Sequence, residues 1–440
     1  MRRICLTLPT NRACAATIAA TGAEAVYAAE HFDVEVHLLI LDSCDSATYE
    51  EHRAAVRGLA PHPRVVVHHL DEDDQRDFLR RVIDRSGAAK PELLLRLMLP
   101  NATSYGACTN RAFLISFALG CESVHRRDSD SRYQVSDGAS VFPVHHELGS
   151  LGLTAEEASR SVSATALAPE SLPRRVSMVG SSFIGPPSVD IDEIAALDND
   201  VYHDIVSLWA PLDHSPEQKR ELVEESFRGA GQAEFEQDRT TLCLVDPMRV
   251  DMCNIAFQDV HRRVPLPPAT DTIGSDYFLL HLVRHAGLPG VLHNRNIVNF
   301  HTAERRTDAG FLAYQTRFAK FLLSMLYHNA VYEALAQAGD TLLDDEGQVR
   351  AAAVAGLVRQ STGLDPADNH ERLRRLDAAY RVLGGRYAEL ADHLGARHHH
   401  LVAEARSDME DFAFLIEEWE PLVRAAARTP AGGSEGGERR

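Results

Sequence analysis

Pairs of aspartates separated by one residue are the first feature of this sequence with a chemical use. The pattern occurs at Asp71/Asp73, Asp128/Asp130, Asp190/Asp192 and Asp198/Asp200. Asp71–Asp74 is typical of the acidic first turn of a helix, and Asp198–Asp200 is typical of a turn. Asp128-Ser129-Asp130 differs because it follows a short extended segment, and an extended triplet points its first and third side chains to the same side. Two carboxylates placed in this way can share a hard divalent cation with a diphosphate.

Two later motifs add a carboxylate and an imidazole. Gly274-Ser275-Asp276 precedes the apolar run Tyr277–Leu280. In that position Ser275 or Asp276 would serve as a helix N-cap, and the alternative is that Asp276 is a general base beside an acceptor hydroxyl. His301 ends the β-rich run Asn294–Phe300, where a neutral imidazole can complete a carboxylate-held metal site. The alternative for one of 22 histidines is an ordinary surface or core residue.

The composition excludes several classes of protein. With 45 Lys and Arg against 64 Asp and Glu, the net charge is −19, so we expect no nucleic-acid partner. No run approaches the roughly 18 to 20 apolar residues that a membrane span needs. The apolar residues before Pro9 are too few for a secretory signal, so we expect a cytoplasmic protein. The seven irregularly spaced cysteines indicate free thiols rather than a disulfide framework.

The elements that position these motifs begin as alternating strands and helices. Ile4–Leu8, Val34–Leu41 and Arg64–His69 are predicted strands, and Ala13–Glu30 is a predicted helix between the first two. Alternation of this kind predicts βαβ units and a mainly parallel sheet. Ligands of open parallel sheets bind beyond the carboxyl ends of the strands, which directs attention to Pro9–Arg12 and to Asp42.

A helix and a charged strand lead into the Asp128 motif. The apolar positions of Ser104–Gly120 are spaced three and four residues apart, which predicts a helix with one buried stripe and with Arg111 just beside that stripe. Val124–Arg127, which comes next, is more charged than a buried strand usually is. Its charge favours a short strand or one at the edge of the sheet.

The last third of the chain is predicted to be helical. Apolar residues from Phe311 onward follow helical spacing, and Leu373–Leu394 keeps a three-and-four spacing over three heptads. This pattern favours a helical hairpin, and the alternative is a coiled coil that would form a homodimer through the C-terminal helices. We therefore expect a domain at residues 1–305 (a nucleotide-binding half at 1–130 and an acceptor half at 131–305), a helical region at 306–428 and a flexible tail at 429–440.

The order of these motifs resembles that of GT-A-fold glycosyltransferases over about residues 1–305. The resemblance implies an α/β fold with a Rossmann-type, mixed and mainly parallel sheet flanked by helices, followed by an all-α extension. It also implies roles for particular residues: Pro9, Thr10, Asn11, Arg12 and Asp42 in the nucleoside pocket, Arg111 at the diphosphate, Asp128 at the ribose and metal, Asp130 and His301 as ligands of Mn²⁺ or Mg²⁺, and Asp276 as the catalytic base.

The activity that this resemblance implies is metal-dependent transfer of a hexose from a nucleotide-diphosphate sugar of the UDP-hexose type. The acceptor would be a hydroxyl of a small soluble molecule, with inversion at the anomeric carbon, as in natural-product glycosyltransferases of actinomycetes. The expected acceptor contacts are Asp190, Asp192, Trp209, Asp246, Asp251 and Asn254. Two alternatives stay open: a non-catalytic nucleotide-sugar binding or scaffold protein, and a sugar nucleotidyltransferase, which also uses paired carboxylates and a metal.

Overall fold

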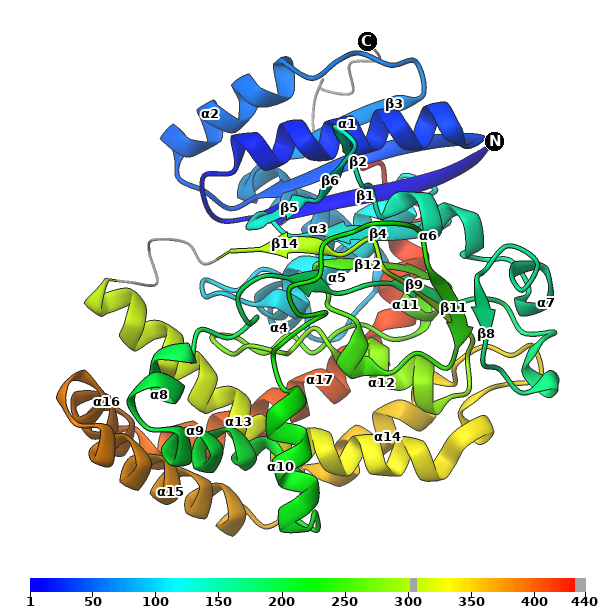
Figure 1. The fold of residues 1–440 in the computed structure, drawn as a ribbon. Helices are drawn as coiled ribbons and strands as arrows, with labels where there is room; N and C mark the ends of the chain where they lie inside the picture. Colours follow the sequence, from blue (N-terminus) through cyan, green and yellow to red (C-terminus); the bar gives the residue numbers. More distant parts are fainter. Residues whose placement is uncertain (301–306, 432–440) are drawn as a thin grey trace.

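A nine-stranded mixed sheet forms the centre of the computed structural model, which describes residues 1–300 and 307–431 (Figure 1). In spatial order the strands are β3 (Val65–Leu70), β2 (Val34–Asp42), β1 (Arg2–Thr10), β4 (Ser123–Arg127), β12 (Asn254–Gln258), β9 (Met178–Gly180), β13 (Gly290–His293), β11 (Thr240–Cys243) and β8 (Ala164–Thr165). Five of the eight neighbouring pairs are parallel. The predicted sheet, mixed and mainly parallel, is therefore confirmed.

Side chains of β1 alternate between two helical layers. Ile4, Leu6 and Leu8 pack in one apolar cluster with α1 (Ala15–His31), whereas Cys5 belongs to the cluster on the opposite face. This follows from the two-residue repeat of a strand. The second face is covered by α3 (Glu72–Ser86), α4 (Pro91–Met98) and α5 (Tyr105–Ala118), and α2 (Ser46–Arg57) packs beside α1. Helices on both faces shield β1 and β2 from solvent.

β4 is a strand of five residues, so the short strand predicted as one alternative for Val124–Arg127 is confirmed and the other alternative, an edge strand, is wrong. It lies between β1 and β12, and all of its residues are buried. The buried charged side chains on each face of β4 are paired with carboxylates from other segments. On one face the Arg127 guanidinium bonds Glu24 at 2.8 and 2.9 Å and Glu147 at 2.9 and 3.0 Å, and His125 Nδ1 lies 2.7 Å from Glu147. A fully paired network avoids the cost of burying a lone charge.

Helix α5 is more enclosed than its sequence pattern predicts. The predicted single buried stripe is wrong, because nearly every residue from Gly106 to Phe117 is buried. One side of α5 lies on β1 and β4, and another contacts α17 (His398–Ala426). A helix held between a sheet and a second helix has no solvent face.

The C-terminal helices join the same core as the sheet. They are α13 (Asp308–Ala338), α14 (Ala351–Ser361), α15 (Ala367–Leu383), α16 (Gly385–Ala396) and α17, and they lie below the sheet in Figure 1. Trp419 of α17 is fully buried and donates from Nε1 to the carbonyl of His261 at 2.9 Å. One apolar cluster runs from Phe113 of α5 to Trp419, so this region is an all-α extension packed on the sheet.

The heptad pattern of Leu373–Leu394 forms a hairpin. The chain turns at Gly384, whose φ of 69° suits glycine, and α15 packs against α16. The apolar residues of the pattern, from Leu373 at 4% exposure to Leu394 at 3%, are buried within the chain, except Leu383, which is partly buried. The predicted boundary at 305 and most of the tail at 429–440 lie outside the described residues.

The middle of the chain consists of short elements between the central strands. The helices are α6 (Val144–Ser150), α7 (Ala155–Ala158), α8 (Asp192–Leu197), α9 (Asn199–Val206), α10 (Pro216–Glu225), α11 (Val260–Arg263) and α12 (Phe278–His285). One small sheet contains β10 (Phe183–Ile184), β14 (Ile297–Asn299) and β5 (Ser131–Tyr133). A second small sheet pairs β6 (Val135–Ser136) with β7 (Ala139–Ser140). Among the described helices, none has the length and apolar character needed to cross a bilayer.

A substitution at Gly106 tests how closely α5 packs against the backbone at Pro267. A Cβ at this position would lie 1.9 Å from the carbonyl oxygen of Pro267. Because that oxygen belongs to the backbone, we expect Gly106→Ala to lower the free energy of unfolding by about 1–3 kcal/mol. The matched control is Gly356→Ala in α14, where no atom lies within 4 Å of the added methyl group. Urea denaturation should show the control equal to or up to about 1 kcal/mol more stable than wild type; equal stabilities of the two variants would contradict the packing.

Candidate functional site

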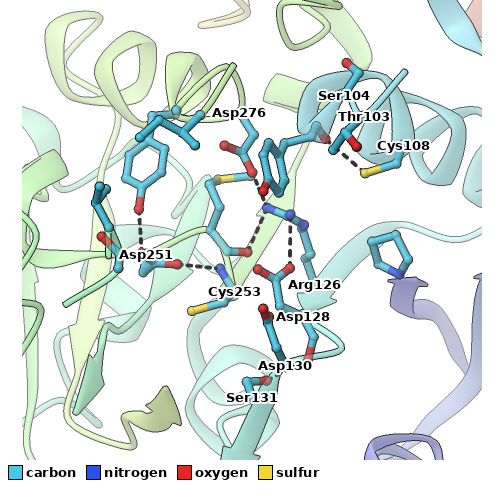
Figure 2. Close-up of a pocket in the computed structure, with 18 of the residues that line it drawn as sticks. Thr103, Ser104, Cys108, Arg126, Asp128, Asp130, Ser131, Asp251, Cys253 and Asp276 are labelled. Carbon is cyan, nitrogen blue, oxygen red and sulfur yellow. Dashed lines mark hydrogen bonds and ion pairs between the residues drawn. The ribbon is translucent and has the colours of Figure 1, made fainter. Parts of the chain in front are cut away.

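A cavity of about 540 Å³ opens where β1 and β4 end. The polar residues around it come from segments far apart in the sequence, and Figure 2 shows their side chains converging. They include Thr10, Asn11, Arg12, Arg126, Asp128, Asp130, Asp251 and Asp276. The carboxyl ends of sheet strands are the usual place for a ligand in open α/β folds.

Arg126 is the central cation of this cavity. Its Nη1 donates to Asp276 Oδ2 at 2.6 Å and to the carbonyl of Met252 at 3.2 Å, and its Nη2 lies 3.0 Å from Asp128 Oδ1 (Figure 2). Only 3% of its side chain is exposed. One buried guanidinium therefore holds two carboxylates from different parts of the chain in fixed positions.

The Asp128 motif adopts a turn. Asp128-Ser129-Asp130 connects β4 to β5, and Ser131 Oγ closes the turn by donating to the carbonyl of Asp128 at 2.8 Å. The expectation of an extended triplet is wrong at this point, because the chain reverses direction to start the next strand. Both carboxylates nevertheless line the cavity, and Asp130 Oδ2 accepts from Arg12 Nη1 at 2.6 Å.

Neither Ser275 nor Asp276 caps a helix. Helix α12 begins at Phe278, its N-cap is Tyr277, and no side chain bonds its first turn. The Asp276 carboxylate points instead to Arg126. The capping alternative for Asp276 is therefore wrong, and its carboxylate lies in the cavity.

Asp251 is a fourth carboxylate in the cavity, held by its own neighbours. Its Oδ2 accepts a short hydrogen bond from the Tyr277 hydroxyl, and its Oδ1 accepts from the backbone N–H of Cys253 at 2.9 Å (Figure 2). Tyr277 follows Asp276 in sequence, so the two acidic groups are linked through one segment.

Together these groups carry surplus negative charge. Four aspartates and two arginines leave two negative charges if all are ionised: Asp128, Asp130, Asp251, Asp276, Arg12 and Arg126. Burial raises the pKa of Asp128 to about 7; the Arg126 guanidinium opposes this rise, and the neighbouring aspartates add to it. The pKa of Asp276 is also raised, again mainly by burial. Carboxylate oxygens are the ligands that Mn²⁺ or Mg²⁺ prefers, so the side chains that border this cavity suit such an ion by their chemistry. Among the described residues, these aspartates do not form a group of three whose ligand atoms lie within 4.8 Å of one another, so holding an ion would require some of them to rotate.

Arg111, expected at the diphosphate, borders the cavity and is bonded to the neighbouring helices. It is 5% exposed, and its Nε donates to Gln75 Oε1 at 2.8 Å while Nη1 donates to the carbonyl of Met98 at 2.7 Å. Burial lowers its pKa. Arg111 borders the cavity, but its donors join α5 to α3 and α4, whereas Arg126 is paired with the carboxylates.

Asp42 lies next to the cavity and turns away from it. Leu41 and Ser43 border the cavity, whereas Asp42 is 1% exposed and its Oδ2 bonds His52 Nδ1 at 2.7 Å and His69 Nε2 at 2.9 Å. Burial opposes ionisation, but these hydrogen bonds outweigh it and hold the pKa of Asp42 well below its usual range. In this arrangement the Asp42 carboxylate is occupied by protein donors, which disagrees with a hydrogen bond to a nucleobase.

Asp42, Cys44 and His52 lie close enough to surround a metal ion. The hydrogen bonds argue against such a site. His52 Nε2 accepts from the backbone N–H of Cys14 at 2.9 Å, so Nδ1 must carry the proton that it donates to Asp42. A protonated Nδ1 cannot ligate a metal, and this cluster is better described as a hydrogen-bonded support for the end of β2.

The remaining expected residues divide into three groups. His301 lies outside the described residues. Pro9, Thr10, Asn11 and Arg12, together with Trp209 and Asp251 among the expected acceptor contacts, line the cavity. Asn254 is fully buried, with Nδ2 donating to the carbonyls of Ser182 and Arg295, and Asp190, Asp192 and Asp246 do not border the cavity.

Sequence reasoning missed Arg126. The available signal was its position two residues before Asp128, because residues two apart in a strand share a face. Val124 and Arg126 occupy that face, and Val124 belongs to the apolar cluster beneath it. Recognising the role of Arg126 from sequence would have required knowing that β4 is central.

The chain belongs to a family described as "Family of unknown function (DUF6271)", whose model matches residues 2–435. No curated protein matches the chain. Among solved structures, a mannosyltransferase, PcManGT from Pyrobaculum calidifontis in complex with GDP-Man and Mn²⁺, is 12% identical, with 95% of this chain and 88% of that chain covered and a TM-score of 0.35. A mycobacterial protein is 17% identical, with 79% and 82% covered and a TM-score of 0.35. At these TM-scores the function has to be argued from the site.

The raised pKa of Asp128 predicts a pH-dependent stability. Because its folded-state pKa is near 7 and its ordinary value is 3.8, the protonated form favours folding, and that contribution is lost as the pH rises through about 7. Asp128→Asn, which mimics the protonated carboxyl, should therefore be more stable than wild type at about pH 8 and closer to it at about pH 5. Thermal unfolding without divalent cations measures this. The exposed Asp204→Asn in α9 is the control, and a pH-independent effect of Asp128→Asn would contradict the prediction.

Proposed function

We propose that this protein is a metal-dependent glycosyltransferase of GT-A type, which transfers a hexose from a nucleotide-diphosphate sugar to a hydroxyl of a small acceptor. The observation that carries the proposal is the convergence of four aspartates and two arginines on one cavity at the carboxyl ends of β1 and β4. Such a set suits a diphosphate and a divalent cation together with a base for the acceptor. A UDP-hexose donor and a role in natural-product biosynthesis are the finer parts of the proposal.

The donor would lie along the end of β1. Pro9–Arg12 border the cavity and supply backbone and side-chain polar groups for the nucleoside. Asp128 and Asp130 would hold Mn²⁺ or Mg²⁺, and His301 is proposed as a further ligand. When bound, the cation supplies Lewis-acid stabilisation of the departing diphosphate. Arg12 and Arg126, which pair with Asp130 and Asp128, would contact the phosphate oxygens.

Asp276 is the proposed base. Its pKa is raised, mainly by burial, so it holds a proton more readily than an ordinary carboxylate. Arg126 fixes the carboxylate at 2.6 Å, which limits its rotation. The base takes the proton of the acceptor hydroxyl as that oxygen attacks the anomeric carbon from the side opposite the diphosphate, and this geometry inverts the configuration.

A nucleotide panel tests the proposed donor site. Thermal shift with UDP, GDP, ADP and CMP, each with and without Mn²⁺, should show a stabilisation by at least one nucleoside diphosphate that depends on the metal. A ligand at about 100 times its Kd adds about 2.7 kcal/mol, which is readily measured. Incubation of the wild type with the matching nucleotide sugar and Mn²⁺ should release the nucleoside diphosphate slowly. Binding without release would favour a sensor, and pyrophosphate exchange with the nucleoside triphosphate would favour a nucleotidyltransferase.

Two substitutions separate metal binding from base catalysis. Asp130→Ala should lose the metal-dependent nucleotide shift, because it removes a metal ligand. Asp276→Asn should keep that shift and lose about 10²- to 10⁴-fold in turnover, the usual contribution of a general base. Asp204→Ala, on the exposed surface of α9, should change neither quantity. Wild-type nucleotide affinity in Asp130→Ala, or near-normal turnover in Asp276→Asn, would contradict the assigned roles.

A further inference from the structure

One side of the cavity is an apolar wall. We define this apolar wall as Trp209, Phe227, Ile273, Phe321 and Met325, which all border the cavity. The ring centroids of Trp209 and Phe227 lie 6.1 Å apart, those of Trp209 and Phe321 6.0 Å, and those of Phe227 and Phe321 6.2 Å. The three rings form one aromatic cluster contributed by three separate segments.

The backbone beside this wall includes one unfavourable conformation, at Phe227, and one conformation that suits glycine, at Gly274. Phe227 has a φ of 63°, which a bulky side chain rarely adopts. Gly274 has a φ of 72°, and a Cβ there would lie 3.0 Å from the Phe321 ring. Strained positions of this kind persist where the surrounding structure requires them, and they cluster at ligand sites. The strain at Phe227 places an aromatic ring beside the cavity where glycine would be easier to accommodate.

Two polar atoms of the aromatic side chains on this side are already hydrogen-bonded. Trp209 Nε1 donates to Ser226 Oγ at 3.1 Å, and the Tyr314 hydroxyl, at the same side of the cavity, accepts from the backbone N–H of Asp190 at 3.1 Å. Hydroxyls that a sugar or cyclitol turned toward the rings of Trp209, Phe227 and Phe321 would find no hydrogen-bond partner in those rings, which is costly. An apolar group would bury its surface with no such loss.

The apolar wall is continuous with the proposed base. Ile273 and Gly274 precede Asp276 in the same segment, and Val250 and Met252, which flank Asp251, also border the cavity. A hydroxyl presented to Asp276 would therefore belong to a molecule whose body faces the apolar wall.

We propose that the acceptor is an alcohol with an apolar ring or alkyl body, bound against the apolar wall, rather than a saccharide or a cyclitol. The role of this molecule as an acceptor rests on the proposed transferase function. Its binding against the apolar wall does not depend on catalysis. It also replaces the expectation that acceptor hydroxyls are recognised by several acidic side chains, since of those expected acids Asp251 alone borders the cavity among the described residues.

Calorimetric titration with matched probes tests the proposal. Decahydro-2-naphthol has two apolar rings and one hydroxyl, whereas myo-inositol and methyl β-glucoside are polyols. We expect the wild-type protein to bind decahydro-2-naphthol at least 10-fold more tightly than either polyol, in the presence of Mn²⁺ and the best nucleotide of the thermal-shift panel. Equal or tighter binding of the polyols would overturn the proposal.

Phe227 allows a variant that does not depend on loss of folding. Phe227→Gly removes the ring and relieves the positive φ, and this relief offsets part of the stability lost with the ring contacts. We expect a cooperatively folded protein together with a loss of at least 10-fold in decahydro-2-naphthol affinity. Phe414→Ala, which removes a half-buried ring of α17 outside the cavity lining, should retain wild-type affinity. Unchanged affinity in Phe227→Gly would mean that the probe binds elsewhere and would refute the site.

Tryptophan fluorescence gives an independent readout. The protein has two tryptophans, of which Trp419 is fully buried and Trp209 borders the cavity. Decahydro-2-naphthol, which does not absorb in the near ultraviolet, should protect Trp209 from acrylamide quenching, and Trp209→Phe should abolish this change. Absence of protection in the wild type would contradict the proposal.

The outcomes distinguish this inference from the proposed function. Phe227→Gly should keep the Mn²⁺-dependent nucleotide shift, because Phe227 is not among the residues proposed to hold the nucleotide or the metal. If nucleotides bind and decahydro-2-naphthol does not, the acceptor class is wrong and the transferase proposal stands. If decahydro-2-naphthol binds in a Phe227-dependent manner and no nucleotide does, the apolar site stands and the transferase proposal fails.

Discussion

The buried guanidinium of Arg126 is the constraint on which the site depends. It lies at the end of β4, inside the protein, and a lone charge in that position would strongly destabilise the fold. Asp128 and Asp276 supply the compensating charge from two different segments. The same ion pairs that make the burial of Arg126 tolerable therefore bring the aspartate motif and the proposed base to one cavity.

Each face of β4 carries a buried arginine, and the charge of each arginine is compensated in a different way. On one face Arg127 is enclosed by Glu24 and Glu147, and their carboxylate oxygens are satisfied within the protein. On the other face Arg126 meets an excess of acid at a cavity open to ligands. The first network stabilises the position of the strand in the sheet. The second leaves charge that a cation can neutralise, and this difference separates a structural network from a candidate site.

The cavity also joins two kinds of surface. Its charged end, at β1 and β4, suits a diphosphate and a metal, whereas its other side consists of the rings of Trp209, Phe227 and Phe321. Helix α13 supplies Phe321 and packs into the same core as the sheet. The helical extension thus contributes directly to the cavity and shares one apolar core with the helices α3, α4 and α5.

Local sequence patterns predicted β1, β2, β3, α1 and α5, because the two-residue and 3.6-residue repeats of these elements depend on neighbours in sequence. They also singled out Asp128, Asp130 and Asp276, which all border the cavity. Only the tertiary structure decided that β4 is central, that Arg126 rather than Arg111 is the cation paired with the carboxylates, and that the Asp42 carboxylate faces two histidines. These outcomes depend on which distant segments supply the compensating charge. Ion pairs between residues far apart in the sequence produce no repeating pattern from which they could be predicted.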